Sequence, residues 1–267
     1  AHGESGSVSL VHIEKNIVAH AHSCTQILFW MEGCHAFSNV NGVQLTLSPW
    51  QGLIVNRWVA HDLQLEDPHR TCVLLKINLQ DDFLERHFPS LGVAYAFTTQ
   101  TINMDPAVLA SIAQLGHNME SSRINAKLVE SDVAQLLLQL EDLQHEPAYK
   151  HRFRGRRKMF DYRLRQTLDF MRANLVESCT VDQLAERVNM SRSRLFQLFH
   201  DEMNSTPLTV WNSLRMEAAM QQLESMELPI GEIAESIGFT QSGNFSRFFH
   251  EHQGLSPRHY RVACRAT

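Results

Sequence analysis

The chain has 267 residues, of which 43% are hydrophobic and 20% are charged, as expected of a globular protein long enough for two domains. Its net charge of −5 is divided unevenly. Residues 1–150 carry 8 Lys and Arg against 16 Asp and Glu, whereas residues 151–267 carry 16 against 13. No apolar run approaches the roughly 18 residues of a membrane helix and no signal peptide is recognised, so we expect no membrane partner.

Cysteine usage points to a reducing compartment. The five cysteines are odd in number, scattered and without a CxxC pair, which favours free thiols and a reducing cytoplasm. Cys24, Cys34 and Cys72 are interpreted as buried structural residues, with a redox or metal sensor as the alternative.

Residues 8–79 carry the signals of many short β-strands. Asn41–Gly42 predicts a hairpin turn, and Pro49, Gly52 and Asp67–Pro68 interrupt the other runs. Closely spaced short strands are typical of a sandwich or a barrel. The expected strands are Val8–Ile13, Thr25–Met31, His35–Val40, Val43–Leu47, Leu53–Val55, His61–Leu65 and Thr71–Ile77. Residues 1–7 are small and polar and are expected to form a disordered tail.

Helical signals follow the strands. A short helix is expected at 81–87, and Asp105–Pro106 supplies an N-cap and a first-turn proline for a helix that runs to about residue 118. Residues 125–143 predict another helix with one broad apolar face, which either packs on the outside of the barrel or joins two chains. Its apolar positions are Leu128, Val129, Val133, Leu136, Leu137, Leu140 and Leu143.

A basic linker at residues 146–158 separates the strand-rich half from the rest. Five of the seven residues from Arg152 to Lys158 are basic, which suggests contact with DNA phosphates, with a merely solvated tether as the alternative. Residues 160–175 then predict the first helix of a C-terminal domain.

The C-terminal domain contains an internal repeat. The segments Val181–Ser191 and Ile230–Thr240 align their apolar positions, and beyond a turn the match resumes one residue later. Each copy predicts a short helix, a tight turn and a second helix with an apolar i, i+3, i+4 stripe. That arrangement is the helix-turn-helix unit, whose second helix enters the major groove of DNA.

The polar faces of the two second helices carry the candidate DNA contacts. Arg, Asn and Gln can pair with base edges, whereas helix N-termini attract phosphates. Ser191 and Thr240 occupy the expected N-cap positions. The candidates are Ser191, Arg192, Ser193, Arg194 and Gln197 in the first copy, Ser242, Gly243, Asn244, Ser246 and Arg247 in the second, and Arg258 beyond it. The alternative is that these are solvated helix faces in an all-helical protein.

About 100 C-terminal residues resemble the AraC/XylS family of transcription regulators. The resemblance rests on Leu184–Ala185, Met190–Leu195, Gly238–Phe239, Phe245–Phe249 and Gly254–Arg261. It implies that both helix-turn-helix units lie in one chain and read adjacent major grooves of double-stranded DNA. Residues 207–226 predict the helix between them, of which about 18 residues at ~1.5 Å each give a length of ~27 Å. The resemblance also implies a homodimer formed through the helices after the barrel, and RNA polymerase as a further partner.

The N-terminal half resembles the cupin-like sensor domain that often precedes such DNA-binding domains. This resemblance rests on His20–Ala21–His22, Gln26, Asn41–Gly42 and His61. In metal cupins such histidines bind one metal together with a carboxylate, but Gln26 occupies the carboxylate position here. We therefore expect no metal and instead a small-molecule effector pocket. Its candidate residues are His20, His22, Gln26, Trp30, Arg57, Trp58 and His61.

Together these patterns predict an α+β protein. Residues 1–145 are expected to form a cupin-like β-barrel with following helices, for sensing and dimerisation, and residues 159–267 an all-α domain with two helix-turn-helix motifs. The expected function is effector-controlled, sequence-specific DNA binding without catalysis or a cofactor. The sequence leaves activation and repression open. The alternatives are a metal-dependent cupin enzyme or metal sensor fused to a DNA-binding domain, and a constitutive DNA binder with a purely structural barrel.

Overall fold

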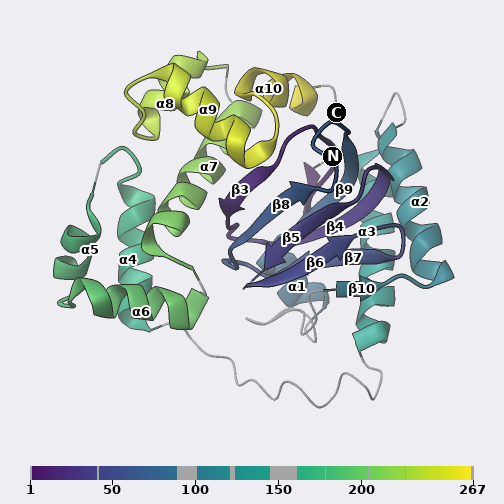
Figure 1. The fold of residues 1–267 in the computed structure, drawn as a ribbon, viewed down its shortest axis with the longest axis horizontal. Coiled ribbons are helices and arrows are strands. Elements are labelled where there is room, and N and C mark those ends of the chain that lie inside the picture. Colours follow the sequence, from purple (N-terminus) through teal and green to yellow (C-terminus); the bar gives the residue numbers. More distant parts are fainter. Residues whose placement is uncertain are drawn as a thin grey trace.

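The computed structural model describes the chain except for residues 1, 41, 89–100, 121–123, 145–160, 178, 204, 226 and 266–267. A strand-rich N-terminal part and a helical C-terminal part lie side by side (Figure 1). The predicted basic linker at 146–158 lies outside the described residues. None of the described helices combines the length and the apolar character that a membrane crossing requires.

The strands form two antiparallel sheets that share an apolar core. One sheet has the order β1-β2-β9-β4-β7-β10, with β1 His2–Gly3, β2 Gly6–Ile13, β9 Cys72–Leu79, β4 Thr25–Gly33, β7 Gln51–Val55 and β10 Thr101–Asn103. The other has the order β3-β8-β5-β6, with β3 Ile17–His20, β8 His61–Leu65, β5 Ala36–Val40 and β6 Val43–Leu47. Between the sheets, Leu28 and Leu74 of the larger one join Val40 and Leu63 of the smaller one in one buried cluster.

The two sheets confirm the strand-rich N-terminal domain that the sequence predicted, and the barrel that they form is not strictly closed. Apart from one isolated bridge between Ser48 and Gln51, the described strands form two separate sheets. The Asn41–Gly42 hairpin prediction is confirmed by the β5–β6 pairing of Val40 with Val43, although Asn41 itself is not described. The expected disordered tail at 1–7 was wrong, because β1 and the start of β2 extend the larger sheet and Gly6 pairs with Leu79.

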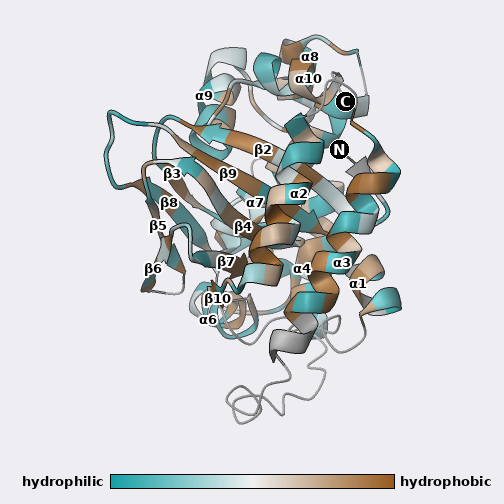
Figure 2. Ribbon diagram, turned by 90° about the vertical axis from the view of Figure 1, so that its right-hand side faces the viewer, coloured by the Kyte–Doolittle hydropathy of each residue, from teal (hydrophilic) through white to brown (hydrophobic). Residues whose placement is uncertain are grey.

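Three helices cover the outer face of the larger sheet. They are α1 Asp81–His87, α2 Pro106–Glu120 and α3 Ala126–Gln144, and Figure 2 shows α2 and α3 against the sheet. Ile27 and Phe29 of β4 point into this second core, while Leu28 points between the sheets. The central strand is therefore buried on both faces, as expected for a strand between two layers. Asp105 caps α2 as predicted, since its Oδ1 accepts from Val108 N–H at 2.8 Å.

Seven helices make up the described C-terminal part. They are α4 Tyr162–Ala173, α5 Val181–Arg187, α6 Arg192–Met203, α7 Pro207–Ser225, α8 Ile230–Ser236, α9 Ser242–Gln253 and α10 Pro257–Arg265. The N-terminal half of α7 is buried in one core with α4, α5 and α6, and its C-terminal half in a second core with α8 and α9. Helix α10 continues beyond Tyr260 to Arg265.

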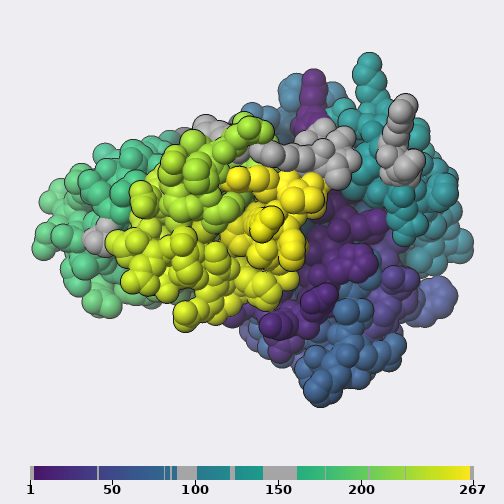
Figure 3. Space-filling model, turned by 90° about the horizontal axis from the view of Figure 1, so that it is seen from above, coloured from purple at the N-terminus to yellow at the C-terminus, as the bar shows by residue number. Residues whose placement is uncertain are grey.

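The two parts are in direct contact. Figure 3 shows the C-terminal helices in yellow lying against the N-terminal strands in purple. Trp58, from the loop between β7 and β8, is only 1% exposed and is buried in the core of α4, α5, α6 and α7. Ser23 N–H donates to Glu217 Oε1 of α7 at 2.7 Å, and Leu255 after α9 packs against the core between the sheets.

Candidate nucleic-acid interface and interdomain cavity

The predicted repeat is confirmed as two equivalent helix-turn-helix units. Helices α5 and α8 each have 7 residues, and α6 and α9 each have 12. In the first turn, Ala185 O accepts from Val188 N–H at 3.2 Å and Met190 N–H at 2.9 Å. In the second turn, Ala234 O accepts from Ile237 N–H at 3.3 Å and Phe239 N–H at 2.9 Å. The second turn is one residue longer, as the sequence offset requires.

The small side chains of Ala185 and Ala234 allow the two helices of each unit to pack closely. Each alanine is 2% exposed or less and lies where the two helices of its unit meet. A larger side chain at this position would separate the helices, so the turn geometry follows from the repeated Leu–Ala and Ile–Ala pairs.

The outer face of α6 is exposed and carries the first set of candidates. Ser191, Arg192, Ser193, Arg194 and Gln197 are all exposed, whereas the opposite stripe of Leu195, Leu198 and Phe199 is buried. Ser191 caps the helix as predicted, because its Oγ accepts from Arg194 N–H at 3.3 Å. Two candidates have neighbours of their own: Arg192 pairs with Asp182 at 3.1 Å, and Gln197 donates to Asp201 at 2.7 Å. These exposed contacts are weak enough to exchange for DNA.

The outer face of α9 carries the second set. Ser242, Gly243, Asn244 and Arg247 are exposed, Ser246 is half-buried, and Arg258 is exposed in the first turn of α10. The expected cap at Thr240 was wrong: the helix begins after Gln241, whose side chain makes no capping bond among the described residues. The N-terminus of α9 is therefore not capped by a side chain, which suits an approaching phosphate.

Comparison with known proteins agrees with this geometry. Residues 184–263, which span both units, match the family described as helix-turn-helix domain. The C-terminal part is an AraC-type domain. The second helices of the two units, α6 and α9, lie in one chain on either side of α7, as the resemblance in the sequence implied.

Curated relatives match mainly over this AraC-type domain. The raffinose operon transcriptional regulatory protein RafR of Pediococcus pentosaceus is 33% identical over 94 residues, 35% of this chain and 34% of that protein. The RCS-specific transcriptional activator RclR of Escherichia coli is 38% identical over 86 residues, 32% and 30% of the two chains. The chain thus spans about a third of the length of these relatives. The uncharacterized transcriptional regulator YdeC of Bacillus subtilis is 23% identical and covers 94% of this chain and 88% of its own.

Solved structures of ToxT from Vibrio cholerae share the whole fold. A ligand-free variant of ToxT superposes with a TM-score of 0.62 at 12% identity, covering 96% of this chain and 97% of that one. The wild-type protein bound to an unsaturated fatty acid gives a TM-score of 0.61 at 14% identity, covering 98% and 97%. This similarity establishes a shared fold, in which a helical domain follows an N-terminal sheet domain.

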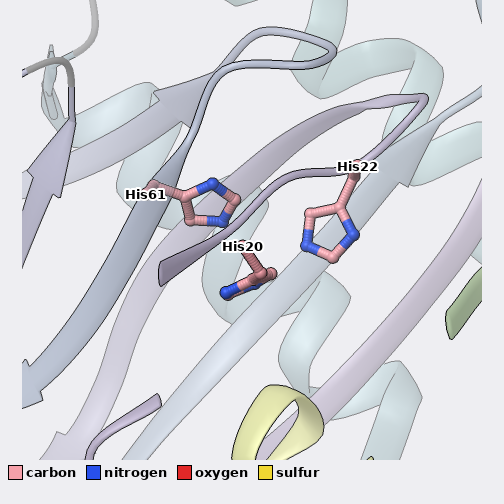
Figure 4. Close-up of side chains that lie close together, drawn as sticks. All are labelled: His20, His22 and His61. Carbon is pink, nitrogen blue, oxygen red and sulfur yellow. The ribbon is translucent and has the colours of Figure 1, made fainter. Parts of the chain in front are cut away.

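A cavity with three histidines lies where the sheet domain meets the AraC-type domain. His20 ends β3 and pairs in register with His61 at the start of β8, while His22 follows β3 (Figure 4). The ring centroids lie 4.4 Å apart for His20 and His61, 4.8 Å for His20 and His22, and 5.3 Å for His22 and His61. The cavity is lined by these three and by Val11, Ile13, Ile17, Gln26, Leu28, Asp62, Leu63, Leu74, Lys76, His252 and Gln253.

Two backbone carbonyls fix the tautomers in this cluster. Nδ1 of His20 lies 2.7 Å from Val18 O, and Nδ1 of His61 lies 3.0 Å from Val59 O. Because a carbonyl only accepts, each Nδ1 carries the proton and each Nε2 keeps its lone pair. Nε2 of His22 and Nε2 of His61 are buried without a hydrogen-bond partner among the described residues.

Burial and mutual repulsion keep these histidines neutral. Burial first, then the neighbouring His61, lower the pKa of His20 and of His22 well below the usual value. Burial lowers the pKa of His61 to about 4. Lys76 also faces the cavity, and burial lowers its pKa too. At neutral pH the three histidines therefore add no positive charge to the cavity.

Interpretation of the sequence alone missed the residues that the AraC-type domain contributes to this cavity. His252 and Gln253 come from the last turn of α9, and the ring of His252 lies 6.1 Å from that of His20. Lys76 Nζ donates to Gln253 Oε1 at 3.4 Å across the domain boundary. No local pattern points to these contacts, since 177 residues separate Lys76 from Gln253.

The other predicted pocket residues are divided among three places. Gln26 lines the cavity and donates to Asn78 Oδ1 at 3.0 Å. Trp30 is half-buried and donates through its indole to Cys34 O at 3.1 Å. Arg57 is half-buried in the loop that carries Trp58, and Trp58 fills the core of the AraC-type domain. The structure thus joins His20, His22, Gln26 and His61 but not the two tryptophans.

Proposed function

We propose that this chain is a sequence-specific DNA-binding transcription regulator whose N-terminal domain binds an effector. The observation that carries the proposal is the pair of equivalent helix-turn-helix units, which share α7 and both leave their reading helices exposed. A solvated-face interpretation does not account for two copies with the same turn hydrogen bonds. The relatives RafR and RclR, which match this domain, are transcription regulators by name.

The reading face divides into two kinds of contact. Ser193, Arg194 and Gln197 of α6 are proposed to read bases in one major groove, and Asn244 and Arg247 of α9 in the next. Phosphate contacts are proposed for Arg192, Ser242, Ser246 and Arg258, together with the helix N-termini at Ser191 and Gly243. All of these except the half-buried Ser246 are exposed. The surplus of basic residues in this half of the chain supports attraction to DNA.

The effector is proposed to act from the interdomain cavity. ToxT, which shares the fold, has been crystallised with an unsaturated fatty acid, and the relative YdeC aligns with nearly the whole of this chain. Here the cavity is lined by residues of the sheets and of α9. A ligand held by both would change the placement of α9 relative to the sheets, and so shift the population that is competent for DNA.

The organisation proposed around this function follows the family resemblance. Residues 1–145 would sense and dimerise, residues 146–158 would link, and residues 159–267 would bind DNA. Dimerisation through α3, contact with RNA polymerase and a cytoplasmic location complete the proposal. The metal-dependent enzyme alternative gains no support from the comparisons, since the relatives are named as transcription regulators.

Replacing Arg247 tests the proposed reading face. Arg247→Ala should weaken binding to a selected operator by about 1–3 kcal/mol and relax the preference at one base pair, because a bidentate contact to guanine is lost. The measurement is operator selection from a random duplex library, followed by gel-shift titration at fixed salt.

A matched control is Arg86→Ala, which removes an exposed arginine of α1 in the sheet domain. It should leave both affinity and preference unchanged. Equal weakening of Arg247→Ala on every duplex would assign Arg247 to a phosphate instead. If the wild-type chain selects no sequence at all, the proposed function fails.

A further inference from the structure

We propose that His20, His22 and His61 bind one divalent transition-metal ion of the Zn²⁺ type, with His252 of the AraC-type domain as the fourth ligand. The proposal identifies the effector as a metal ion. The part of it that concerns control of DNA binding by this ion rests on the proposed function. It departs from the sequence-based expectation of no metal, which depended on the missing carboxylate at Gln26. The structure supplies another donor in its place, from a helix of the other domain.

The spacing of the three imidazole rings is close to that of a tetrahedral metal site. One ligand nitrogen from each of His20, His22 and His61 lies within 4.8 Å of the others. With metal–nitrogen bonds of about 2.0–2.1 Å, tetrahedral ligand nitrogens are about 3.3 Å apart and the ring centroids about 5 Å apart. The observed centroid distances of 4.4, 4.8 and 5.3 Å lie on either side of this value. Small side-chain rotations are therefore enough to bring the nitrogens into range.

Backbone carbonyls already hold two of the three imidazole rings in the orientation that a metal ion requires. The carbonyls of Val18 and Val59 hold Nδ1–H of His20 and His61, which leaves Nε2 of each as the donor atom. Metal-bound histidines characteristically donate their other N–H to such an acceptor. The buried Nε2 atoms of His22 and His61 lack a hydrogen-bond partner among the described residues. A buried acceptor without a partner costs free energy, and an ion at the centre of the cluster would remove that cost.

His252 of the AraC-type domain is also held by a backbone carbonyl in a way that leaves Nε2 available for a metal. It is 9% exposed, and its Nδ1 lies 2.7 Å from Phe248 O, so Nε2 is again the free donor atom. Its ring lies 6.1 Å from that of His20, farther than the three sheet-domain histidines lie from one another. Closing this distance would draw the last turn of α9 toward β3. Because α9 is the proposed reading helix of the second unit, metal binding would set its position relative to the sheets.

The ligand chemistry selects the class of ion. Four imidazoles suit Zn²⁺, Cu²⁺ or Ni²⁺ and do not suit Mg²⁺ or Ca²⁺, which take oxygen ligands. Lys76 lines the same cavity as the three histidines, so its ammonium group opposes any cation bound there. Its Nζ is turned toward Gln253 Oε1 at 3.4 Å. Removing the charge of Lys76 should therefore strengthen metal binding. A purely structural role for Lys76 does not predict an increase in affinity.

The test measures metal binding by the full-length, tag-free protein after chelator treatment. Titration with Co²⁺ followed by absorption spectroscopy should show one equivalent with the intense visible bands of a tetrahedral site, and Zn²⁺ should displace it. His22→Gln and His61→Gln should each weaken Zn²⁺ binding at least about 100-fold, and His252→Gln about 10-fold. Lys76→Met should strengthen it. The control, His12→Gln, replaces an exposed histidine of β2 and should change nothing.

Circular dichroism of each metal-free variant shows whether it has folded. If His22→Gln and His61→Gln do not fold, His252→Gln still tests the site, because His252 lies in the other domain. Binding of less than one equivalent by the wild type, an octahedral Co²⁺ spectrum, or equal loss in His12→Gln would overturn the site. Wild-type affinity in His252→Gln would overturn the interdomain ligand. Gel shifts with and without Zn²⁺ separate the two proposals: DNA binding that Zn²⁺ leaves unchanged overturns the regulatory role, whereas no DNA binding under either condition overturns the proposed function and leaves the metal titration standing.

Discussion

Residues Asn189 and Gly238 occupy the same point in the two turns and share a left-handed backbone, with φ of 52° and 89°. Asn tolerates this conformation better than other residues with a side chain, whereas Gly adopts it freely. Their surroundings differ. A Cβ on Gly238 would lie 2.8 Å from the carbonyl oxygens of Leu175 and Val176 and 2.9 Å from Arg215 Nη2. The second turn therefore requires glycine for space as well as for its backbone angle.

Alanine at position 238 should consequently be costly. Gly238→Ala is expected to lower the free energy of unfolding by about 2–3 kcal/mol, because it adds both left-handed strain and a contact with two backbone oxygens. Asn189→Gly, at the equivalent position, should change stability by no more than about 1 kcal/mol. Urea unfolding followed by circular dichroism compares the two. A loss in Gly238→Ala as small as in Asn189→Gly would contradict the steric argument.

At this scale the sequence predicted one site well and the other in part. The α6 and α9 candidates follow from helical periodicity, which places polar and apolar side chains on opposite faces without reference to the rest of the fold. The cavity depends on contacts between distant segments. His20, His22 and His61 could be grouped through a resemblance, but His252 projects from α9 among residues that the repeat assigned to a DNA-binding helix. The repeat offers no hint, since the equivalent residue in α6 is Glu202.

Helix α3 uses most of its apolar surface within its own domain. Val129, Val133, Leu136, Leu137 and Leu140 are all buried in the core under the larger sheet. Intramolecular packing therefore accounts for most of the predicted stripe. Leu128 and Leu138, however, are 45% and 54% exposed. With Ser131 and Gln135 they share the outer face of the helix, which is where the proposed dimer would form.

A charge on that face should separate the proposed dimer. Leu138→Glu is expected to shift the wild-type dimer to monomers in sedimentation velocity, because burial of a carboxylate against an apolar partner is strongly unfavourable. Leu208→Glu is the control, since Leu208 is a 63% exposed leucine of α7 in the AraC-type domain. The sedimenting species of Leu208→Glu should have the same mass as that of the wild type. A wild-type chain that sediments as a monomer, or a Leu138→Glu variant that remains a dimer, would rule out dimerisation through α3.

Elements with strong local signals were predicted closely, and elements stabilised by distant partners were missed. The α1 prediction matches Asp81–His87, and Asp105–Pro106 correctly placed the start of α2. Strands β1, β3 and β10 have 2, 4 and 3 residues, too few for a period-two pattern. Each exists because a neighbouring strand completes its hydrogen bonds.

The junction between the two domains is the feature of the whole molecule that sequence reasoning could not reach. The sequence-based interpretation placed Trp58 among the candidate pocket residues. In the structure it adopts a left-handed φ of 62°, and its N–H donates to His22 O at 2.6 Å. Its side chain then lies among Leu164, Leu168 and Trp211. One loop of the sheet domain thus both positions the backbone of His22 and completes the core of the first helix-turn-helix unit.

This arrangement predicts that Trp58 couples the stability of the AraC-type domain to the sheet domain. Trp58→Ala leaves a cavity in the first helical core and should destabilise that unit by about 3–5 kcal/mol. Amides of α4 and α6 should then exchange with solvent at least about 100-fold faster, while amides of α9, whose core is separate, keep their protection. Hydrogen exchange resolved by peptide measures both at once. Trp50→Ala, which removes a 67% exposed tryptophan of the same domain, should change neither. Equal acceleration in α4, α9 and the larger sheet would mean that Trp58 supports the fold as a whole, and unchanged exchange in α4 would mean that the junction carries no stabilising contact.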